Sequence, residues 1–584
     1  AEDTGGASVA VGPWALSSQN YDGNAYNTAV GYLAGEDVTT GVKNTLIGGL
    51  AGDAITTGER NVYLGYTTGT SATDVSFNVG LGAESLYTNV NGSRNVAVGN
   101  GALFAMNPAS DTDTYNVAVG YDAGVSVTTG VRNTFIGGLA GDANTTADAN
   151  TAMGYAAFGA NTTDANNVAI GYQALEANTT ASNNTAVGLN SLRANTTGAQ
   201  NTAVGTSAGL TLTTGSSNVA VGFEALKNED AHGLNTAIGT QALFSQNAGA
   251  DAYNVAVGYQ TGAAITTGTQ NVAVGALAGD ALTNADFNVA VGHEALSGDT
   301  LGSRSTAIGR AALRAQNFTS ATDAYNVAVG MNAGLSVTTG TDNTLIGGLA
   351  GDALTVGNSN VAVGTYALGA DTKGDRNVAI GRAALQVQNF TTTTDSYNTA
   401  VGYGAGESVT TATGLTLIGG LAGDVITTGA NNTGVGNYAL SATTTGAQNT
   451  ALGVQALVSN TTADNNTAVG MNALFANTTG TQNVAVGALA GDALTTGSEN
   501  TALGYLALST EDTGTGNVAI GRSALAAQNY NANNYNTAVG YLAGAAVTTG
   551  VQNTFLGGLA GDALTEAHYN VAVGYAALSS DTLG

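Results

Sequence analysis

The chain has 584 residues, of which 85 are glycine, 2 are proline and none is cysteine, and its formal net charge is −27. The absence of cysteine excludes disulfides and thiolate metal sites. The scarcity of bases argues against nucleic acid as a partner, and the periodic aliphatic residues distinguish the chain from disordered sequences. No apolar run is long enough to cross a bilayer, so we expect no membrane insertion.

The sequence repeats itself from one end to the other. A five-residue motif, typified by Asn95–Gly99 (NVAVG), occurs 33 times between Ser8 and Asn570. Of the 32 steps between copies, 26 are 17 residues long, three are 19 and three are 21. Such self-similarity is typical of solenoids, in which each repeat forms one coil. We therefore predict an all-β parallel β-solenoid of about 33 coils, forming a single continuous domain over residues 1–584 without a separate cap, stalk or anchor.

Each coil is numbered here from the Asn of its motif as position 1. Position 2 is Thr or Val and position 4 is Val, Ile, Leu or Met, whereas position 3 is mostly Ala. This alternation predicts a strand, and we place positions 2 and 4 in the core and position 3 on the outer face. Replacing the position-4 residue Val329 by Asp is therefore expected to destabilise several adjacent coils.

Positions 1 and 5 are the most regular. Position 1 is Asn in 30 of 33 coils, and we expect the amides to stack as a ladder, each bonding its copies above and below. Position 5 is Gly in every coil, which signals a positive φ or a close backbone approach. Representative members of this predicted structural ladder are Asn27, Gly31, Asn95, Gly99, Asn167, Gly171, Asn254 and Gly258.

Two exchanges between positions indicate shared space. Where position 9 is Gly rather than Leu or Phe, position 12 is usually aliphatic, as at Val38, so one bulky side chain fills each layer from either place. Where position 3 is large, as at Leu46 and Phe135, position 6 is Gly, and we predict that positions 3 and 6 share space. Tyr63 is an exception to the second rule.

Positions 13–17 usually read Thr-Thr-Gly-x-x and predict a corner, so that each coil would hold two short strands and two turns. A spacing of about 4.8 Å per coil gives a rod of roughly 160 Å. The six longer steps carry insertions that we expect to bulge from one edge, each with a tyrosine just before the next coil: Tyr26, Tyr115, Tyr253, Tyr325, Tyr397 and Tyr535.

The motif resembles a known repeat. Asn167–Gly171 (NVAIG) and Ser8–Gly12 (SVAVG) are similar to the head repeats of YadA-like trimeric autotransporter adhesins and to repeats in virion tail fibres. That resemblance implies a left-handed parallel β-roll with three chains around one axis. The family's units are typically a few residues shorter than 17, and its neck, coiled-coil stalk and membrane anchor have no counterpart in this sequence.

No chemistry is evident in the polar residues. His232, His293 and His568 fall at different coil positions without metal-ligand spacing, and we interpret them as solvated. We expect no catalytic residues, no cofactor and no enzymatic activity. An Asp follows Leu-Ala-Gly in seven coils, where a solvated turn carboxylate is favoured and calcium is the alternative; these residues are Asp53, Asp142, Asp280, Asp352, Asp424, Asp492 and Asp562.

These features favour an extracellular structural or adhesive fibre at a cell surface. We expect the chain to associate with itself, as a homotrimer by the resemblance, and to have a possible host-surface or matrix ligand. The alternative is a bacteriophage or other virion tail fibre.

Neither end of the sequence carries an atypical capping repeat, which predicts that rods join end to end into filaments. Placing Gly584 against Ala1 gives a step of 22 residues, close to the longest internal step of 21. The assembly ends would then include Ala1, Trp14 and Gly584. A fragment of a longer chain would have the same open ends.

Overall fold

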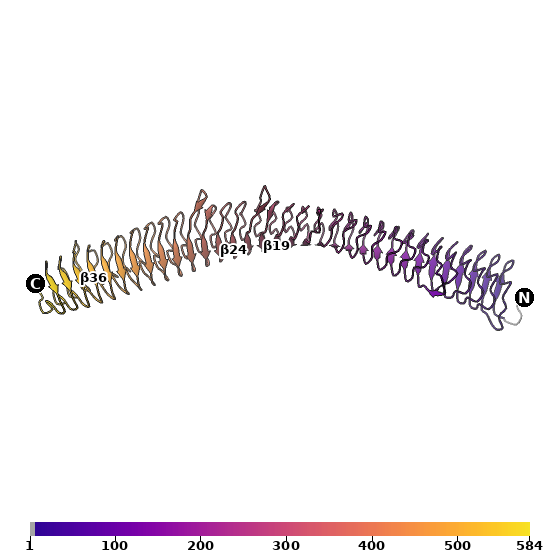
Figure 1. Cartoon of the computed structure of the whole chain (residues 1–584), viewed down its shortest axis with the longest axis horizontal. Helices are drawn as coiled ribbons and strands as arrows, with labels where there is room; N and C mark the ends of the chain where they lie inside the picture. The colour runs from indigo at the N-terminus through magenta and orange to yellow at the C-terminus, as the bar shows by residue number, and fades with distance from the viewer. Residues whose placement is uncertain (1–5, 584) are drawn as a thin grey trace. The chain divides into compact units, whose positions relative to one another are not determined.

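The computed structural model describes residues 6–583 and divides the chain into two compact units, Ala1–Phe287 and Asn288–Gly584. Each unit is a stack of coils joined by parallel three-residue strands (Figure 1). The described residues contain no helix, and therefore none long and apolar enough to span a membrane. The all-β parallel solenoid of about 33 coils is confirmed, whereas one uninterrupted solenoid over residues 1–584 stays a prediction.

In the first unit, the strands of the main sheet are β1 (Val9–Val11), β2 (Thr28–Val30), β3 (Thr45–Ile47), β4 (Val62–Leu64), β5 (Val79–Leu81), β7 (Val96–Val98), β9 (Val117–Val119), β10 (Thr134–Ile136), β11 (Thr151–Met153), β12 (Val168–Ile170), β13 (Thr185–Val187), β14 (Thr202–Val204), β15 (Val219–Val221), β16 (Thr236–Ile238), β17 (Val255–Val257) and β18 (Val272–Val274). Each strand covers positions 2–4 of its coil. Successive strands pair in parallel with equal positions opposite each other, as Val168 pairs with Thr185.

In the second unit, the corresponding strands are β19 (Val289–Val291), β21 (Thr306–Ile308), β23 (Val327–Val329), β24 (Thr344–Ile346), β25 (Val361–Val363), β27 (Val378–Ile380), β29 (Thr399–Val401), β30 (Thr416–Ile418), β31 (Thr433–Val435), β32 (Thr450–Leu452), β33 (Thr467–Val469), β34 (Val484–Val486), β35 (Thr501–Leu503), β36 (Val518–Ile520), β37 (Thr537–Val539), β38 (Thr554–Leu556) and β39 (Val571–Val573). Parallel pairing in the same register continues through this unit, as between Val327 and Thr344.

The predicted second strand of each coil is wrong for most of the chain. Non-glycine residues at positions 7, 9 and 17 adopt left-handed backbone angles, as at Gln173 (φ 53), Leu175 (φ 51) and Asn183 (φ 64). A strand cannot pass through such residues, so positions 6–12 form turns instead. Backbone hydrogen bonds still join these turns to the adjacent coils, since Leu175 N donates to Ser191 O at 3.1 Å.

Additional strands occur where the step is 21 residues long. Two-residue strands pair there as β6 with β8, β20 with β22, and β26 with β28; their bounds are Gly92–Ser93, Thr112–Asp113, Gly302–Ser303, Thr322–Asp323, Gly374–Asp375 and Thr394–Asp395. In the second unit the two such insertions project beyond the neighbouring coils (Figure 1).

The two faces of the strand are the reverse of the prediction. The position-3 alanines are buried, as at Ala97 and Ala328, each 0% exposed, whereas Val62 and Leu64 at positions 2 and 4 are 37% and 42% exposed. The interior of each coil is filled from positions 9 and 12, so position 3 usually has room for no more than a methyl group. Val329 is therefore on the outer face, and its expected role in the core is wrong.

The exchange between positions 9 and 12 is confirmed. A Cβ on Gly35 (position 9) would come within 3.2 Å of the Val38 side chain (position 12), which fills the vacated space. The exchange between positions 3 and 6 has a different cause, because position 6 lies outside. Leu46 packs against the position-9 glycines of its own and the preceding coil, and Cβ atoms on Gly52 and Gly35 would come within 2.9 and 2.5 Å of its methyl groups.

The same packing explains Tyr63, which departed from the predicted rule. Its ring is fully buried against Gly52 and Gly69, which again are the position-9 glycines of successive coils. Large position-3 residues therefore occur between glycines at position 9 of two successive coils, and they do not require glycine at position 6.

Candidate assembly surface

The predicted asparagine ladder lies inside the solenoid, and its amides bond mainly to the backbone. Asn27, Asn95, Asn167 and Asn254 are at most 1% exposed. Asn27 Oδ1 accepts the backbone N–H of Asn44, in the next coil, at 2.8 Å, and its Nδ2 donates to Gly41 O, in its own coil, at 2.8 Å. Amide-to-amide bonds occur only in some pairs and are longer, as from Asn95 Nδ2 to Asn78 Oδ1 at 3.2 Å. The ladder predicted from the sequence thus exists, but it is chiefly a side chain-to-backbone ladder.

The predicted glycines are required for two reasons. Gly31, Gly99, Gly171 and Gly258 have φ values of 144, 134, 139 and 142. A Cβ at any of them would come within 2.7 Å of the backbone of the next coil. Both expectations for position 5 are therefore confirmed, and these residues set the close approach of successive coils.

The outer face of the sheet is uncharged and largely apolar. Positions 2 and 4 carry no charged residue in any of the 33 coils. Many of their aliphatic side chains are substantially exposed, including Leu64, Met153, Val204 and Ile238 in the first unit and Ile308, Ile346, Ile380, Ile418, Leu452, Leu503 and Leu556 in the second. Exposed apolar surface that continues from coil to coil is unusual on a monomeric protein.

Exposed aromatic and long apolar side chains line the same strands at position 6. They are Tyr32, Tyr66, Tyr121, Tyr155, Tyr172, Leu189, Phe223 and Tyr259 in the first unit, and Met331, Tyr403, Val454, Met471, Tyr505, Tyr541 and Tyr575 in the second. Tyr155 and Tyr172, in successive coils, stack with their ring centroids 5.7 Å apart. The outer strip, defined as positions 2, 4 and 6 of the coils, thus carries Val or Thr at position 2, Val, Ile, Leu or Met at position 4, and an aromatic residue at position 6 in 11 of the 33 coils.

Most of the bases lie beside this strip at position 17 or within it at position 6. Nine of the 13 Lys and Arg residues occupy position 17 or position 6: Lys43, Arg60, Arg94, Arg132, Arg304, Arg310, Arg376, Arg382 and Arg522. The Arg94 guanidinium lies 4.7 Å from the Phe77 ring centroid and 5.7 Å from that of Tyr115, and Arg382 donates to Tyr403 Oη at 3.2 Å. Aromatic residues and arginine around an apolar centre are the composition of protein–protein interfaces.

The predicted assembly ends are only partly described. Trp14 is 63% exposed and has a left-handed φ of 66, so its ring is available for contact. Ala1 and Gly584 lie outside the described residues. The end-to-end joining of rods stays a prediction.

The predicted solvated carboxylates are partly buried. Buried Oδ1 atoms of Asp142, Asp424, Asp492 and Asp562 have no hydrogen-bond partner among the described residues. Burial raises the pKa of Asp142, Asp424 and Asp492. Their environment therefore disfavours the charged form, which corrects the interpretation from the sequence.

The histidines differ from one another. His293 and His568 are exposed, as predicted, and His568 Nδ1 accepts the Val551 N–H at 3.1 Å. His232 is instead partly buried, with Nδ1 3.7 Å from Glu229 Oε1. Within residues 6–583, Glu229, Asp230 and His232 form the single grouping of three potential metal ligands.

No family model matches the chain, and no curated protein matches it either. The function has to be argued from the surface. Sequence reasoning missed the outer strip, although two signals could have found it. Thr and Val interchange freely at position 2, which is typical of a half-exposed position, and the bases concentrate at the two positions that flank the strand.

Proposed function

We propose that the chain is a structural fibre protein whose solenoid units associate with further copies of the same chain through the outer strip. The observation that carries this proposal is the uninterrupted lack of charge at positions 2 and 4, in a chain with a net charge of −27. A soluble monomer with so many acidic residues has no physical need to keep both strand positions of this face free of charge in every coil.

The energetics support association through this face. Burying an exposed aliphatic side chain contributes about 1.5–3 kcal/mol when its removal from water is complete. Each coil offers one apolar residue at position 4, a Val or Thr at position 2 and, in many coils, an apolar residue at position 6, and the contribution accumulates along the stack. Three copies around one axis are the arrangement that the resemblance to YadA-like heads implies, and they would cover this face on every chain.

The test removes the apolar character of the strip without touching the core. Leu452 and Leu503 at position 4 are 47% and 42% exposed, so replacing both by Glu should leave each coil folded. The control replaces the exposed corner residues Thr462 and Thr479 by Glu, which adds the same charge away from the strip. We expect light scattering to give three times 57.2 kDa for the unmodified chain and the control, and a smaller mass for the outer-strip variant. A monomer at micromolar concentration for the unmodified chain, or an unchanged mass for the variant, would contradict the proposal.

We further propose an extracellular location and an adhesive role, both supported by the resemblance alone. Immunogold labelling of intact cells of the source organism would place the fibre. Binding of the purified chain to immobilised matrix proteins would test adhesion, and labelling confined to virions would favour a tail fibre instead.

A further inference from the structure

The turn at Glu229–His232 differs from three related turns that also contain a buried carboxylate. In four coils a buried carboxylate at position 12 accepts the backbone N–H of the residue at position 15. These bonds are Gly302 N to Asp299 Oδ1 (3.0 Å), Gly374 N to Asp371 Oδ1 (3.0 Å), Gly514 N to Glu511 Oε1 (2.8 Å) and His232 N to Glu229 Oε1 (3.1 Å). Position 15 is glycine in three of these coils and histidine in one.

The glycine leaves room for a second bond. A Cβ on Gly302 would come within 2.2 Å of Asp299 Oδ2, the oxygen that accepts Gln316 Nε2 at 2.6 Å. The coil of Asp371 repeats this geometry, because a Cβ on Gly374 would come within 2.1 Å of Asp371 Oδ2 and Gln388 donates to that oxygen at 2.6 Å. A side chain at position 15 is therefore incompatible with the carboxylate–glutamine bond.

The coil of His232 has no such bond. Glu229 and Gln246 are both fully buried, yet Glu229 Oε2 and Gln246 Nε2 have no hydrogen-bond partner among the described residues. Leaving a buried polar atom unpaired is costly, and native structures seldom do so without another role for the atom. Glu229 thus has an unpaired second oxygen where Asp299 and Asp371 bond to Gln316 and Gln388, and where Glu511 accepts Asn534 Nδ2.

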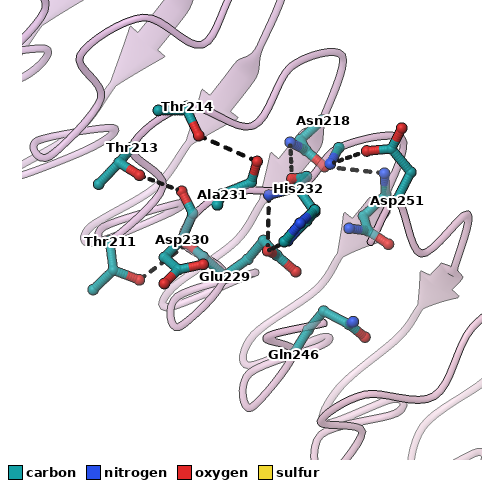
Figure 2. A network of polar contacts seen from close by, with 12 residues as sticks. Thr211, Thr213, Thr214, Asn218, Glu229, Asp230, Ala231, His232, Gln246 and Asp251 are labelled. Carbon is teal, nitrogen blue, oxygen red and sulfur yellow. Dashed lines mark hydrogen bonds and ion pairs between the residues drawn. The ribbon is translucent and has the colours of Figure 1, made fainter. Parts of the chain in front are cut away.

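The Glu229 carboxylate lies next to two other potential metal ligands. The His232 ring lies beside the Glu229 carboxylate, with Nδ1 3.7 Å from Oε1 and without a hydrogen-bond partner of its own (Figure 2). One ligand atom each from Glu229, Asp230 and His232 lie within 4.8 Å of one another. Asp230 is exposed, so the group is open to solvent on one side.

The main chain of this segment is held in place from both neighbouring coils. In the preceding coil, hydroxyl groups of Thr211, Thr213 and Thr214 donate to the carbonyls of Glu229, Asp230 and Ala231 at 3.1, 2.7 and 3.3 Å (Figure 2). From the next coil, Asp251 Oδ1 accepts the Gly233 N–H at 2.9 Å. The three side chains therefore project from a fixed backbone, which reduces the ordering needed to bind a ligand.

We propose that Glu229, Asp230 and His232 form a binding site for one divalent transition-metal ion of the zinc class. One imidazole nitrogen and two carboxylate oxygens are a ligand set typical of zinc, and a nitrogen ligand disfavours calcium. Zinc binds such atoms at about 2.0–2.2 Å, so the three ligand atoms, which lie within 4.8 Å of one another, would move closer together on binding one ion. The exposed side next to Asp230 leaves the remaining coordination position to water.

The test uses the full chain and zinc chloride alone. Calorimetric titration should give one site per chain, and His232→Gly and Glu229→Gln should each weaken it at least tenfold. Both variants should fold, because glycine occupies position 15 in the equivalent coils and an amide caps the same turn where Asn89 Oδ1 accepts Gly92 N at 2.8 Å. His568→Asn and Glu511→Gln are matched controls that should leave zinc binding unchanged.

A second measurement separates a metal site from a simple ion pair between His232 and Glu229. Copper(II) added to the full chain should show hyperfine coupling to one imidazole nitrogen, lost in His232→Gly and kept in His568→Asn. The absence of one-site zinc binding in the unmodified chain, or equal zinc affinity in His232→Gly, would overturn the proposal.

Discussion

Replacing Ala328 by Asp tests which face of the strand is inside. Ala328 is 0% exposed in β23, where it pairs with Ala307 and Leu345 of the neighbouring coils. The larger side chain overpacks this space at a cost of about 1–3 kcal/mol. A buried carboxylate without a partner adds about 1–3 kcal/mol or more. We therefore expect a loss of about 2–6 kcal/mol from the two contributions together, spread over adjacent coils because they depend on one another.

The matched control is Val329→Asp in the same strand. Val329 is only partly buried, so the carboxylate keeps contact with water and the cost should stay below about 1 kcal/mol. Hydrogen exchange of the full chain, read around β21–β24, would show the loss of protection for Ala328→Asp alone. Equal loss of protection in both variants, or greater loss in Val329→Asp, would refute the assignment of the faces. Measurement under conditions that keep the chain monomeric excludes effects on association.

Two further predictions concern glycine and pH. Gly171→Ala should strongly lower the thermal unfolding temperature, because φ is 139 and a Cβ would come within 2.4 Å of Gly188 O. Gly348→Ala is the control, and it should be nearly neutral because nothing lies within 4 Å of its Cβ. Raised pKa values of Asp142, Asp424 and Asp492 mean that the folded chain binds protons more tightly than the unfolded chain. The stability that these three carboxyls contribute should therefore be fully present below about pH 3.9 and be lost as the pH rises above that value. Asp492→Asn should flatten this dependence; a profile that rises over the same range would contradict it.

Periodicity was sufficient to predict the coil, because both the strand and the close approach of coils depend on local residues. Gly31 and its equivalents could be identified from their strict spacing, since only glycine fits a positive φ against the next backbone. The packing of Val38 into the space beside Gly35 could be predicted from the sequence, because a large side chain occurs either at position 9 or at position 12.

The buried face of the strand could not be predicted from the periodicity. Alternation places positions 2 and 4 on one face, but it does not say which face is inside, and the usual rule assigns the larger aliphatic residues to the core. Here the larger residues at positions 9 and 12 already fill the interior, so alanine packs inward. The grouping of Glu229 with His232 was missed because the turn that joins them depends on a buried cap specific to a few coils.

The left-handed residues at positions 7, 9 and 17 bear on how the solenoid is built. An L-residue enters this conformation at a cost of about 1–2 kcal/mol, and several of them recur in each coil. The bonds that hold them come from the adjacent coil, as when Leu192 N donates to Ala208 O at 3.0 Å. An isolated coil therefore lacks the hydrogen bonds that stabilise its left-handed residues. Folding should resemble crystal growth, with a slow seeding event followed by rapid addition of coils onto an existing surface.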